Sequence, residues 1–136
     1  MSTIPAVSPY LTVRNAQSLL AFYKAVFDAT VLSTMPAEDG VRLMHATISV
    51  HGTHIMLCDE FPEHGGDPAP DPDQGSPVAL SLRLETSLDV DALYQKALDH
   101  GGKMHWEPSD MFWGDRFAQF IDPSGHRWML VARKDT

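Results

Sequence analysis

Apolar and polar residues alternate near the start of the chain, then fall at helical spacing, and then alternate again. The alternation over residues 7–13 predicts a strand. From Asn15, which we expect to be an N-cap, apolar residues three and four apart predict a helix to about Ala29. Three further alternating stretches predict short strands, the last two joined by a tight turn at 50–53: residues 31–35, 41–50 and 53–59.

The second half of the chain shows the same order of periods. Residues 78–85 alternate and predict a strand. A helix is predicted over about 90–100, with Ser87 or Asp89 as its N-cap and a pair of glycines after its last turn. Three more strands are predicted, the last two joined by a turn at 122–125: residues 103–106, 116–121 and 127–133.

The two predicted helices share an internal repeat. Ala21-Phe22-Tyr23 is echoed 71 residues later by Ala92-Leu93-Tyr94, and each copy is followed by a strand-rich stretch. The chain therefore predicts two similar β-α-β-β-β modules and an α+β fold. A duplicated module commonly builds its working surface where the two copies face each other, so we expect the site there.

An acidic segment separates the two modules. Residues 60–77 hold five acids, five prolines and three glycines, and no Lys or Arg. Because proline restricts the backbone and removes hydrogen-bond donors, we expect this linker to have no regular structure. The predicted organisation is one domain over 1–136, with module one at 5–59 and module two at 78–133.

Composition narrows the classes of function. The net charge of −8 disfavours nucleic-acid binding, which needs clustered Lys and Arg. No apolar run reaches the roughly 18 residues of a membrane span, and the first residues lack the pattern of a secretory signal. The single Cys58 cannot form an internal disulfide. We therefore expect a cytoplasmic protein with no membrane or nucleic-acid partner.

Strand parity assigns faces to the first module. Met44, Ala46, Ile48 and Val50 are expected to pack under the helix. The opposite side is expected to line a cavity, and it carries Leu43, His45, Thr47 and Ser49, with His54, Met56 and Cys58 from the next strand. Asp59 is expected to cap the end of that hairpin.

The closing motifs Trp113-Gly114-Asp115-Arg116 and Asp122-Pro123-Ser124-Gly125-His126-Arg127-Trp128 resemble the vicinal oxygen chelate superfamily, which includes glyoxalases, extradiol dioxygenases and bleomycin-binding proteins. Ser8-Pro9-Tyr10-Leu11 and Ile55-Met56-Leu57-Cys58-Asp59-Glu60 resemble its PhnB-like branch. The resemblance implies paired modules that form a half-barrel cavity. The activity is not implied, because this fold hosts many functions.

In metal-using members of the superfamily, four strand positions supply the ligands. The resemblance places these positions at Ser8, Met56, Pro77 or Ala79, and Met129. None offers the imidazole or carboxylate that a divalent ion prefers. We therefore expect no metal and no other cofactor.

Histidine and cysteine leave alternatives open. His45 and His54 face the same side and could hold a metal, and His45 could act as a general base. We favour a hydrogen-bonded interior His45 without a catalytic role. Cys58 is expected to be a buried small hydrophobic residue, because Asp59 and Glu60 beside it disfavour a thiolate.

Six aromatic residues gather in the second module. We expect Trp128 to be core, together with one of Phe117 and Phe120. Trp106 and Trp113 are expected to bracket a loop over 107–112 at the cavity mouth. These aromatics could form a stacking platform for a flat ligand, a packed lid or a dimer contact, and Trp113 is the indole least expected to be core.

The sequence thus predicts a metal-free protein that binds a small molecule, with sequestration of a planar aromatic antibiotic as its role and a homodimer as its assembly. The alternatives are an enzyme with an unconventional metal site or His45 acid–base chemistry, and a dimer with a vestigial cavity. The residues expected to contact the ligand are Tyr10, His45, Met56, Cys58, Trp106, Phe112, Trp113, Arg116, Phe117 and Met129.

Overall fold

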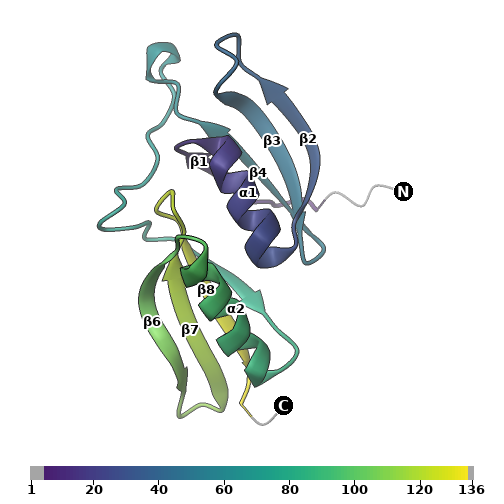
Figure 1. The fold of residues 1–136 in the computed structure, drawn as a ribbon, viewed down its shortest axis with the longest axis vertical. Helices are drawn as coiled ribbons and strands as arrows, with labels where there is room; N and C mark the ends of the chain where they lie inside the picture. Colours follow the sequence, from purple (N-terminus) through teal and green to yellow (C-terminus); the bar gives the residue numbers. More distant parts are fainter. Residues whose placement is uncertain (1–4, 135–136) are drawn as a thin grey trace. The chain divides into compact units, whose positions relative to one another are not determined.

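The computed structural model describes residues 5–134, which form two compact units that divide between Ala69 and Pro70. Each unit contains one four-stranded sheet and one α-helix (Figure 1). The strand that opens each unit is followed by the helix and then by three more strands. The predicted α+β fold with two repeated β-α-β-β-β modules is confirmed.

The first unit builds its sheet in the order β1-β4-β3-β2. β1 runs parallel to β4, and the other neighbours are antiparallel. The parallel pair follows from the helix, which carries the chain back between β1 and the later strands. The elements are β1 (Tyr10–Val13), α1 (Ala16–Phe27), β2 (Thr30–Pro36), β3 (Leu43–Val50), β4 (Thr53–Asp59) and the 3-10 helix η1 (Pro62–His64).

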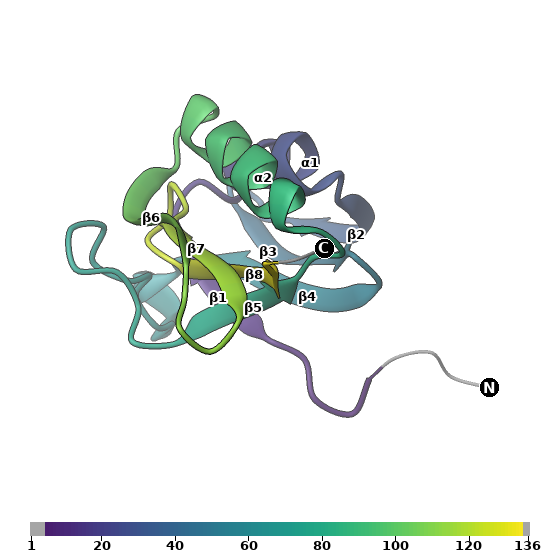
Figure 2. The ribbon, with the colours of Figure 1, turned by 90° about the horizontal axis from the view of Figure 1, so that it is seen from below.

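The second unit repeats this arrangement, with the order β5-β8-β7-β6 and a parallel pair of β5 and β8. Figure 2 shows each helix lying on one face of its own sheet. One face of each sheet is thus covered by a helix, and we call the opposite face the open face. The elements are β5 (Ala79–Arg83), α2 (Ser87–Asp99), β6 (Lys103–Asp110), β7 (Asp115–Ile121) and β8 (Arg127–Arg133).

Helix α1 packs its apolar stripe on the sheet of the first unit. Tyr23 and Val13 are fully buried, as are Ile48 and Leu57 of the central strands. The residues of β3 and β4 that were predicted to face the helix therefore do so over most of the length of the two strands. Met44 is the exception, because it is 53% exposed while its neighbour Leu43 is buried. A register shift between Met35 and Pro36 in the β2–β3 pairing breaks the alternation at this point.

A buried carboxylate joins the ends of three elements in the first unit. Asp59, at the end of β4, is 3% exposed. Its two oxygens accept backbone N–H groups from Ala16 at 2.9 Å and Leu43 at 2.7 Å. Asn15 occupies the N-cap position of α1 in a left-handed conformation and makes no side-chain cap. The N-cap position predicted for Asn15 is confirmed, but Asp59, and not the Asn15 side chain, accepts the first amide of the helix.

Asp122 has the corresponding role in the second unit. One carboxylate oxygen accepts the N–H groups of Ser124 and His126, and the other accepts the indole N–H of Trp128 at 3.0 Å. Trp128 is 2% exposed and stacks on Phe120. The prediction that Trp128 is core is confirmed. Only one of the two phenylalanines was expected to be core, but Phe117 (9% exposed) is buried as well as Phe120. The carboxylate therefore ties the β7–β8 turn to the largest side chain of the core.

The structure corrects three local predictions in and near the second unit. Helix α2 is capped by Thr86, in a reciprocal capping box with Asp89, and not by Ser87 or Asp89. β6 continues to Asp110, so the predicted loop over 107–112 is mostly strand. The linker was predicted to have no regular structure, yet it contains η1.

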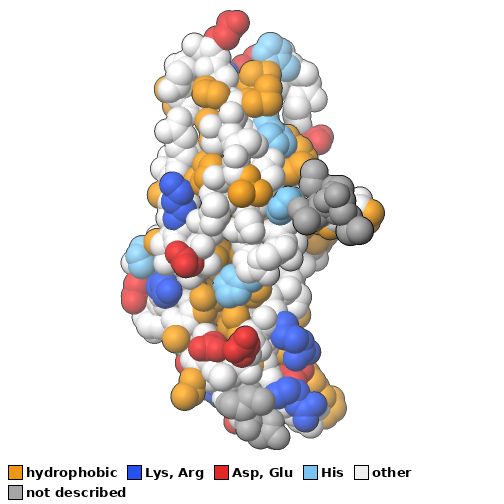
Figure 3. Space-filling view, turned by 90° about the vertical axis from the view of Figure 1, so that its right-hand side faces the viewer, with side chains coloured by type: hydrophobic (Ala, Val, Ile, Leu, Met, Phe, Trp, Pro, Cys, Tyr) orange, Lys and Arg blue, Asp and Glu red, His pale blue; other side chains and the backbone are white. Residues whose placement is uncertain are grey.

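Within residues 5–134, no helix is long and apolar enough to cross a membrane. The surface mixes chemical types, and Figure 3 shows hydrophobic and histidine side chains interspersed with charged ones on one side of the molecule. Several of the large exposed hydrophobic side chains belong to the sheets themselves and not to loops: Tyr10, Leu32, Met35, Met44, Met104 and Trp106.

We predict that Asp59→Ala lowers the free energy of unfolding by about 2–4 kcal/mol, because two buried amides lose a charged acceptor. Chemical denaturation followed by circular dichroism measures this change. Asp67→Ala is the matched control, because Asp67 is exposed in the linker and its change should stay within about 0.5 kcal/mol. Equal effects of the two substitutions would show that Asp59 does not hold the unit together.

Candidate functional site

The open face of the first sheet carries two rows of side chains that cross its four strands. Pairing partners in neighbouring strands project from the same face, so the register defines each row. One row consists of Tyr10, Met56, Thr47 and Ser33, and the other of Thr12, Cys58, His45 and Met35. Neither row contains an Asp, Glu, Lys or Arg.

A short hydrogen-bonded chain lies across these rows. The hydroxyl of Tyr10 bonds with Nδ1 of His45 at 2.9 Å, and Nε2 of His45 bonds with the hydroxyl of Thr47 at 2.8 Å. The Tyr10 and His45 rings lie 5.6 Å apart. In a neutral imidazole one ring nitrogen donates and the other accepts, and a hydroxyl can serve either role. The chain therefore holds the imidazole in one orientation without a carboxylate partner.

Cys58 lies within this cluster. Burial raises the pKa of Tyr10 above its usual value of 10.0, and the neighbouring Cys58 raises it further. The shift favours the protonated phenol, which can donate a hydrogen bond. Cys58 is half-buried, more exposed than the fully buried hydrophobic residue that the sequence predicted. Tyr10, His45, Met56 and Cys58 are thus brought together, as expected for a shared surface.

The residues at the metal positions of the superfamily do not fit a divalent ion. The strand register places Tyr10 beside Met56, in place of Ser8. It places Ser81 beside Met129, in place of Pro77 or Ala79. Thioether, phenol and hydroxyl groups are poor ligands for Mg²⁺, Mn²⁺ or Zn²⁺. Among residues 5–134, no three His, Cys, Asp or Glu side chains lie close enough together to hold an ion.

The predicted alternative of a metal between His45 and His54 is wrong. His54 pairs with Ser49, four residues along β3 from His45. At about 3.3 Å per residue, the two histidines are roughly 13 Å apart along the strand. One ion cannot bridge them, because a metal–nitrogen bond is only about 2 Å long.

The second unit presents an aromatic open face. Trp106 and Phe117 meet edge to face, with ring centroids 6.4 Å apart. Phe117 lies on the side of β7 opposite the fully buried Phe120, and Met129 projects from the same side of β8. Trp106, Phe117 and Met129 therefore project from the same side of the second sheet, where Trp106 is exposed and Phe117 is buried beneath it.

The remaining predicted contacts of the second unit lie elsewhere. Arg116 points to the helix side, where it forms ion pairs with Asp91 of α2 at 2.8 Å and with Asp110 at 3.0 Å. Phe112 and Trp113 form a separate edge-to-face pair in the turn between β6 and β7. Phe112 is 96% exposed, and the indole N–H of Trp113 donates to Asp115. The alternation of side chains along β7 could have predicted this orientation of Arg116. Neighbouring residues of a strand point to opposite faces, and Phe117 points to the open face.

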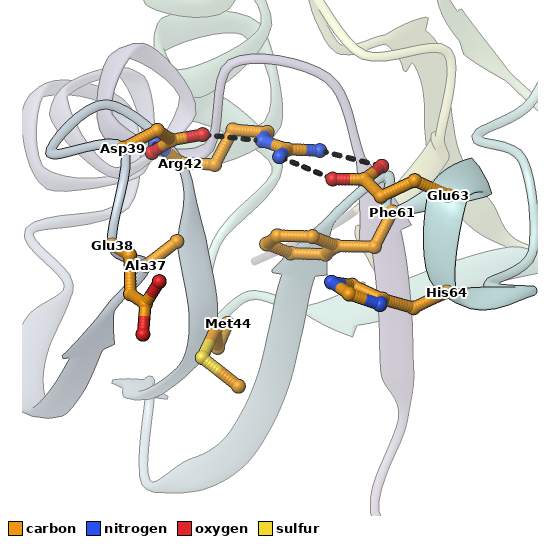
Figure 4. A pocket seen from close by; sticks show the side chains of 8 residues that line it. All are labelled: Ala37, Glu38, Asp39, Arg42, Met44, Phe61, Glu63 and His64. Carbon is orange, nitrogen blue, oxygen red and sulfur yellow. Dashed lines mark hydrogen bonds and ion pairs between the residues drawn. The ribbon is translucent and has the colours of Figure 1, made fainter.

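A pocket of about 670 Å³ opens beside the first sheet, and the sequence did not indicate it. Figure 4 shows Ala37 and Glu38 on one side, Phe61 and His64 on the other, and Met44 between them. These residues come from the β2–β3 turn, the start of β3, and the linker with η1. The only sequence signal was an aromatic residue within the acidic linker. The lining residues are Ala37, Glu38, Asp39, Arg42, Met44, Phe61, Glu63 and His64.

Arg42 organises this pocket. Its guanidinium bonds with the carboxylates of Asp39 and Glu63 and with the backbone carbonyl of Glu60. It also lies 4.2 Å above the centre of the Phe61 ring. Hydrogen bonds from Arg42 lower the pKa of Asp39 and of Glu63, each to about 2. The two carboxylates in turn raise the pKa of Arg42.

The sequence of this chain matches one protein family and several proteins of mycobacteria. The profile of the Glyoxalase/Bleomycin resistance protein/Dioxygenase superfamily matches residues 4–130. An uncharacterized protein of Mycobacterium bovis is 40% identical over 128 residues, which cover 93% of this chain and 82% of the relative. An uncharacterized protein of Mycobacterium tuberculosis is also 40% identical, over 93% of this chain and 73% of its own length.

Solved structures share the fold at low sequence identity. The PhnB protein from Bacillus cereus has a TM-score of 0.75 and 19% identity, covering 94% of this chain and 99% of its own. The fosfomycin resistance protein FosX from Listeria monocytogenes, solved with Mn(II) and sulfate, has a TM-score of 0.72 and 15% identity, covering 94% and 91%. At such identities the likeness concerns the fold alone.

We predict that Asp39 and Glu63 titrate together near pH 2. Because their pKa values are lowered from 3.8 and 4.5, their ion pairs stabilise the fold fully above about pH 4.5 and lose this effect as the pH falls toward 2. Carbon NMR of the side-chain carboxyl groups measures both midpoints. In Arg42→Gln both midpoints should rise toward ordinary values. Wild-type midpoints close to 4 would contradict this network.

Proposed function

The chain belongs to the Glyoxalase/Bleomycin resistance protein/Dioxygenase superfamily, and from this premise we propose that it binds a small organic molecule without a bound metal ion. The observation that carries the proposal is the Tyr10–His45–Thr47 hydrogen-bonded chain on an uncharged open face. Ligand sites in proteins are mostly apolar, with a few polar groups in fixed places. Methionine and cysteine side chains supply the apolar part here, and the hydroxyls and imidazole supply the polar part.

The donor set supports the metal-free part of the proposal. Methionine stands at Met56 and Met129, paired with Tyr10 and Ser81, so these four positions carry neither the imidazole nor the carboxylate that a divalent ion prefers. The manganese in the Listeria monocytogenes structure belongs to that protein. The chemistry we assign to this chain is therefore desolvation, stacking and hydrogen bonding.

The second unit favours an aromatic ligand. Trp106 is 49% exposed and is supported from one side by Phe117. A flat ligand stacked on such an indole gains about 0.5–1.5 kcal/mol beyond the burial of area. We propose Trp106 as the stacking indole in preference to Trp113, because Trp106 lies on a sheet face and Trp113 in a turn. A planar aromatic natural product fits these features, and sequestration of an antibiotic is the role that we propose.

A second candidate, acid–base catalysis by His45, is favoured by one observation. Both ring nitrogens of His45 contact hydroxyls, and the hydroxyl of Tyr10 also neighbours Cys58. Such a chain can relay a proton to a bound molecule. Recovery of the bound ligand separates the two functions, because a sequestering protein returns it chemically unchanged.

We also propose that the protein is a homodimer. The edge strands β2 and β6 have unpaired backbone groups along one side and are mostly exposed. Leu32 and Met35 add apolar surface to β2, and Met104 and Trp106 add it to β6. Exposed, apolar edge strands favour association with another chain.

We predict that planar aromatic antibiotics bind the metal-free protein. Titration of quinoxaline- and anthracycline-type compounds in the presence of EDTA should quench tryptophan fluorescence below about 100 µM, which corresponds to roughly 5.5 kcal/mol. Trp106→Ala should weaken binding about tenfold, through lost stacking and burial. Tyr10→Phe tests the open face of the first unit by itself and should weaken binding there severalfold, because His45 loses one hydrogen-bond partner.

Trp113→Ala is the matched comparison, because it removes the other exposed indole and leaves the open face intact. If Trp113→Ala weakens binding and Trp106→Ala does not, the ligand stacks at the turn. Absence of quenching by every compound would contradict an aromatic ligand, and binding that requires added metal would contradict the metal-free proposal.

We predict that light scattering at micromolar concentration returns about twice the mass of one chain. Met35→Lys and Met104→Lys, which place a charge on each exposed edge, should shift the population toward the single chain. Ala25→Lys, on the exposed side of α1, is the control and should leave the mass unchanged. A single-chain mass for the wild type would exclude the homodimer.

A further inference from the structure

The pocket beside Arg42 is a second site with different chemistry. It shares no residue with the two rows of the open face. Its volume of about 670 Å³ lies within the usual range for small-molecule sites. We propose that this pocket binds an organic cation with a flat apolar body, such as an aryl-substituted ammonium. The proposal does not depend on the function assigned to the open face.

The charge of the lining selects a cation. Three carboxylates line the pocket, those of Glu38, Asp39 and Glu63, against the single guanidinium of Arg42. Arg42 already donates to Asp39, Glu63 and the carbonyl of Glu60, so its hydrogen-bonding groups are engaged. An anion would meet two surplus negative charges and little free donor capacity. A cation would meet a complementary field.

Glu38 is the group that would contact the charge. Within the described part of the chain, its carboxylate has no hydrogen bond or ion pair, in contrast to Asp39 and Glu63. Figure 4 shows it across the pocket from Phe61. A charged group between Glu38 and Phe61 would gain the attraction of the carboxylate without breaking the Arg42 network.

The walls of the pocket suit an aromatic or alkyl-ammonium body. Phe61 is held in place from one side by the guanidinium of Arg42, and its ring lies 6.2 Å from that of His64. Met44 is 53% exposed and contributes a polarisable thioether. Aromatic faces attract cations, and thioethers pack well against flat rings. The carboxylate thus recognises the charge and the opposite wall recognises the body.

Nitrogen-15 NMR titration with three probes of similar size tests the proposal. The probes are benzyltrimethylammonium, benzyl alcohol and benzoate, which differ in charge. The ammonium should shift the amide signals of 37–44 and 61–65 in a saturable way. Benzyl alcohol and benzoate should bind at least fivefold more weakly. Equal binding of the ammonium and the alcohol, or shifts confined to other segments, would overturn the proposal.

Two variants locate the charge and the ring. Glu38→Gln should weaken binding of the ammonium roughly fivefold, as expected for one ion pair at about 4 Å in water-like surroundings. Glu85→Gln is the matched control, because Glu85 is an exposed acid of the second unit. It should change the dissociation constant by less than twofold, and an equal effect of both variants would show that only net charge matters.

Phe61→Leu keeps an apolar side chain and removes the ring, so binding of the ammonium should fall about fivefold while binding of the alcohol changes little. If this variant does not fold, Glu38→Gln and the three probes decide the matter alone. The outcome is independent of the open face, because Tyr10→Phe and Trp106→Ala should leave this titration unchanged.

Discussion

The geometry of the first unit depends on one buried carboxylate. Asp59 accepts the first amide of α1 and the first amide of β3, and it is itself the last residue of β4. Three elements therefore meet at a single carboxylate. Water could take over its hydrogen bonds only by entering the core. Buried amides are costly to leave unpaired, so this contact fixes where the helix begins and where β3 enters the sheet. Asp122 has the same effect on the turn and the core tryptophan of the second unit.

The two surfaces of the first unit that we propose as binding sites both depend on the start of β3. Leu43 points into the core, and the register shift against β2 lets the next two side chains both leave it. Met44 then lines the acidic pocket, and His45 joins Tyr10 on the open face. Two chemically distinct surfaces, one uncharged and one acidic, thus arise within a few residues. Since Asp59 anchors this strand end, the core supports both surfaces together.

We propose different ligands for the two surfaces because their polar groups are in different states. On the open face, hydroxyls and an imidazole satisfy one another, and none of these groups carries a formal charge when the imidazole is neutral. An uncharged molecule loses little by entering such a surface. In the pocket, a single guanidinium is shared by two carboxylates, and a third carboxylate remains unpaired among the described residues. The two proposals therefore differ in the charge of the ligand that each surface would accept.

The sequence by itself determined the repeat, the order of elements, the superfamily and the side of β3 and β4 that carries His45, Met56 and Cys58. These features depend on local periodicity, which a strand or helix expresses whatever it packs against. The same alternation would have assigned Arg116 to the helix side, opposite Phe117, had it been applied along β7.

Only the tertiary structure decided the rest, because it depends on contacts between residues far apart in the chain. The cap of α1 comes from Asp59, 43 residues away, and not from the adjacent Asn15. β6 extends to Asp110 because β7 pairs with it, against the weak strand propensity of a segment that contains Pro108. The acidic pocket forms because Arg42 draws Glu63 and Phe61 of the linker to the β2–β3 turn. Local sequence patterns do not predict these contacts, because each residue fits the secondary structure of its own segment whether or not its distant partner is present.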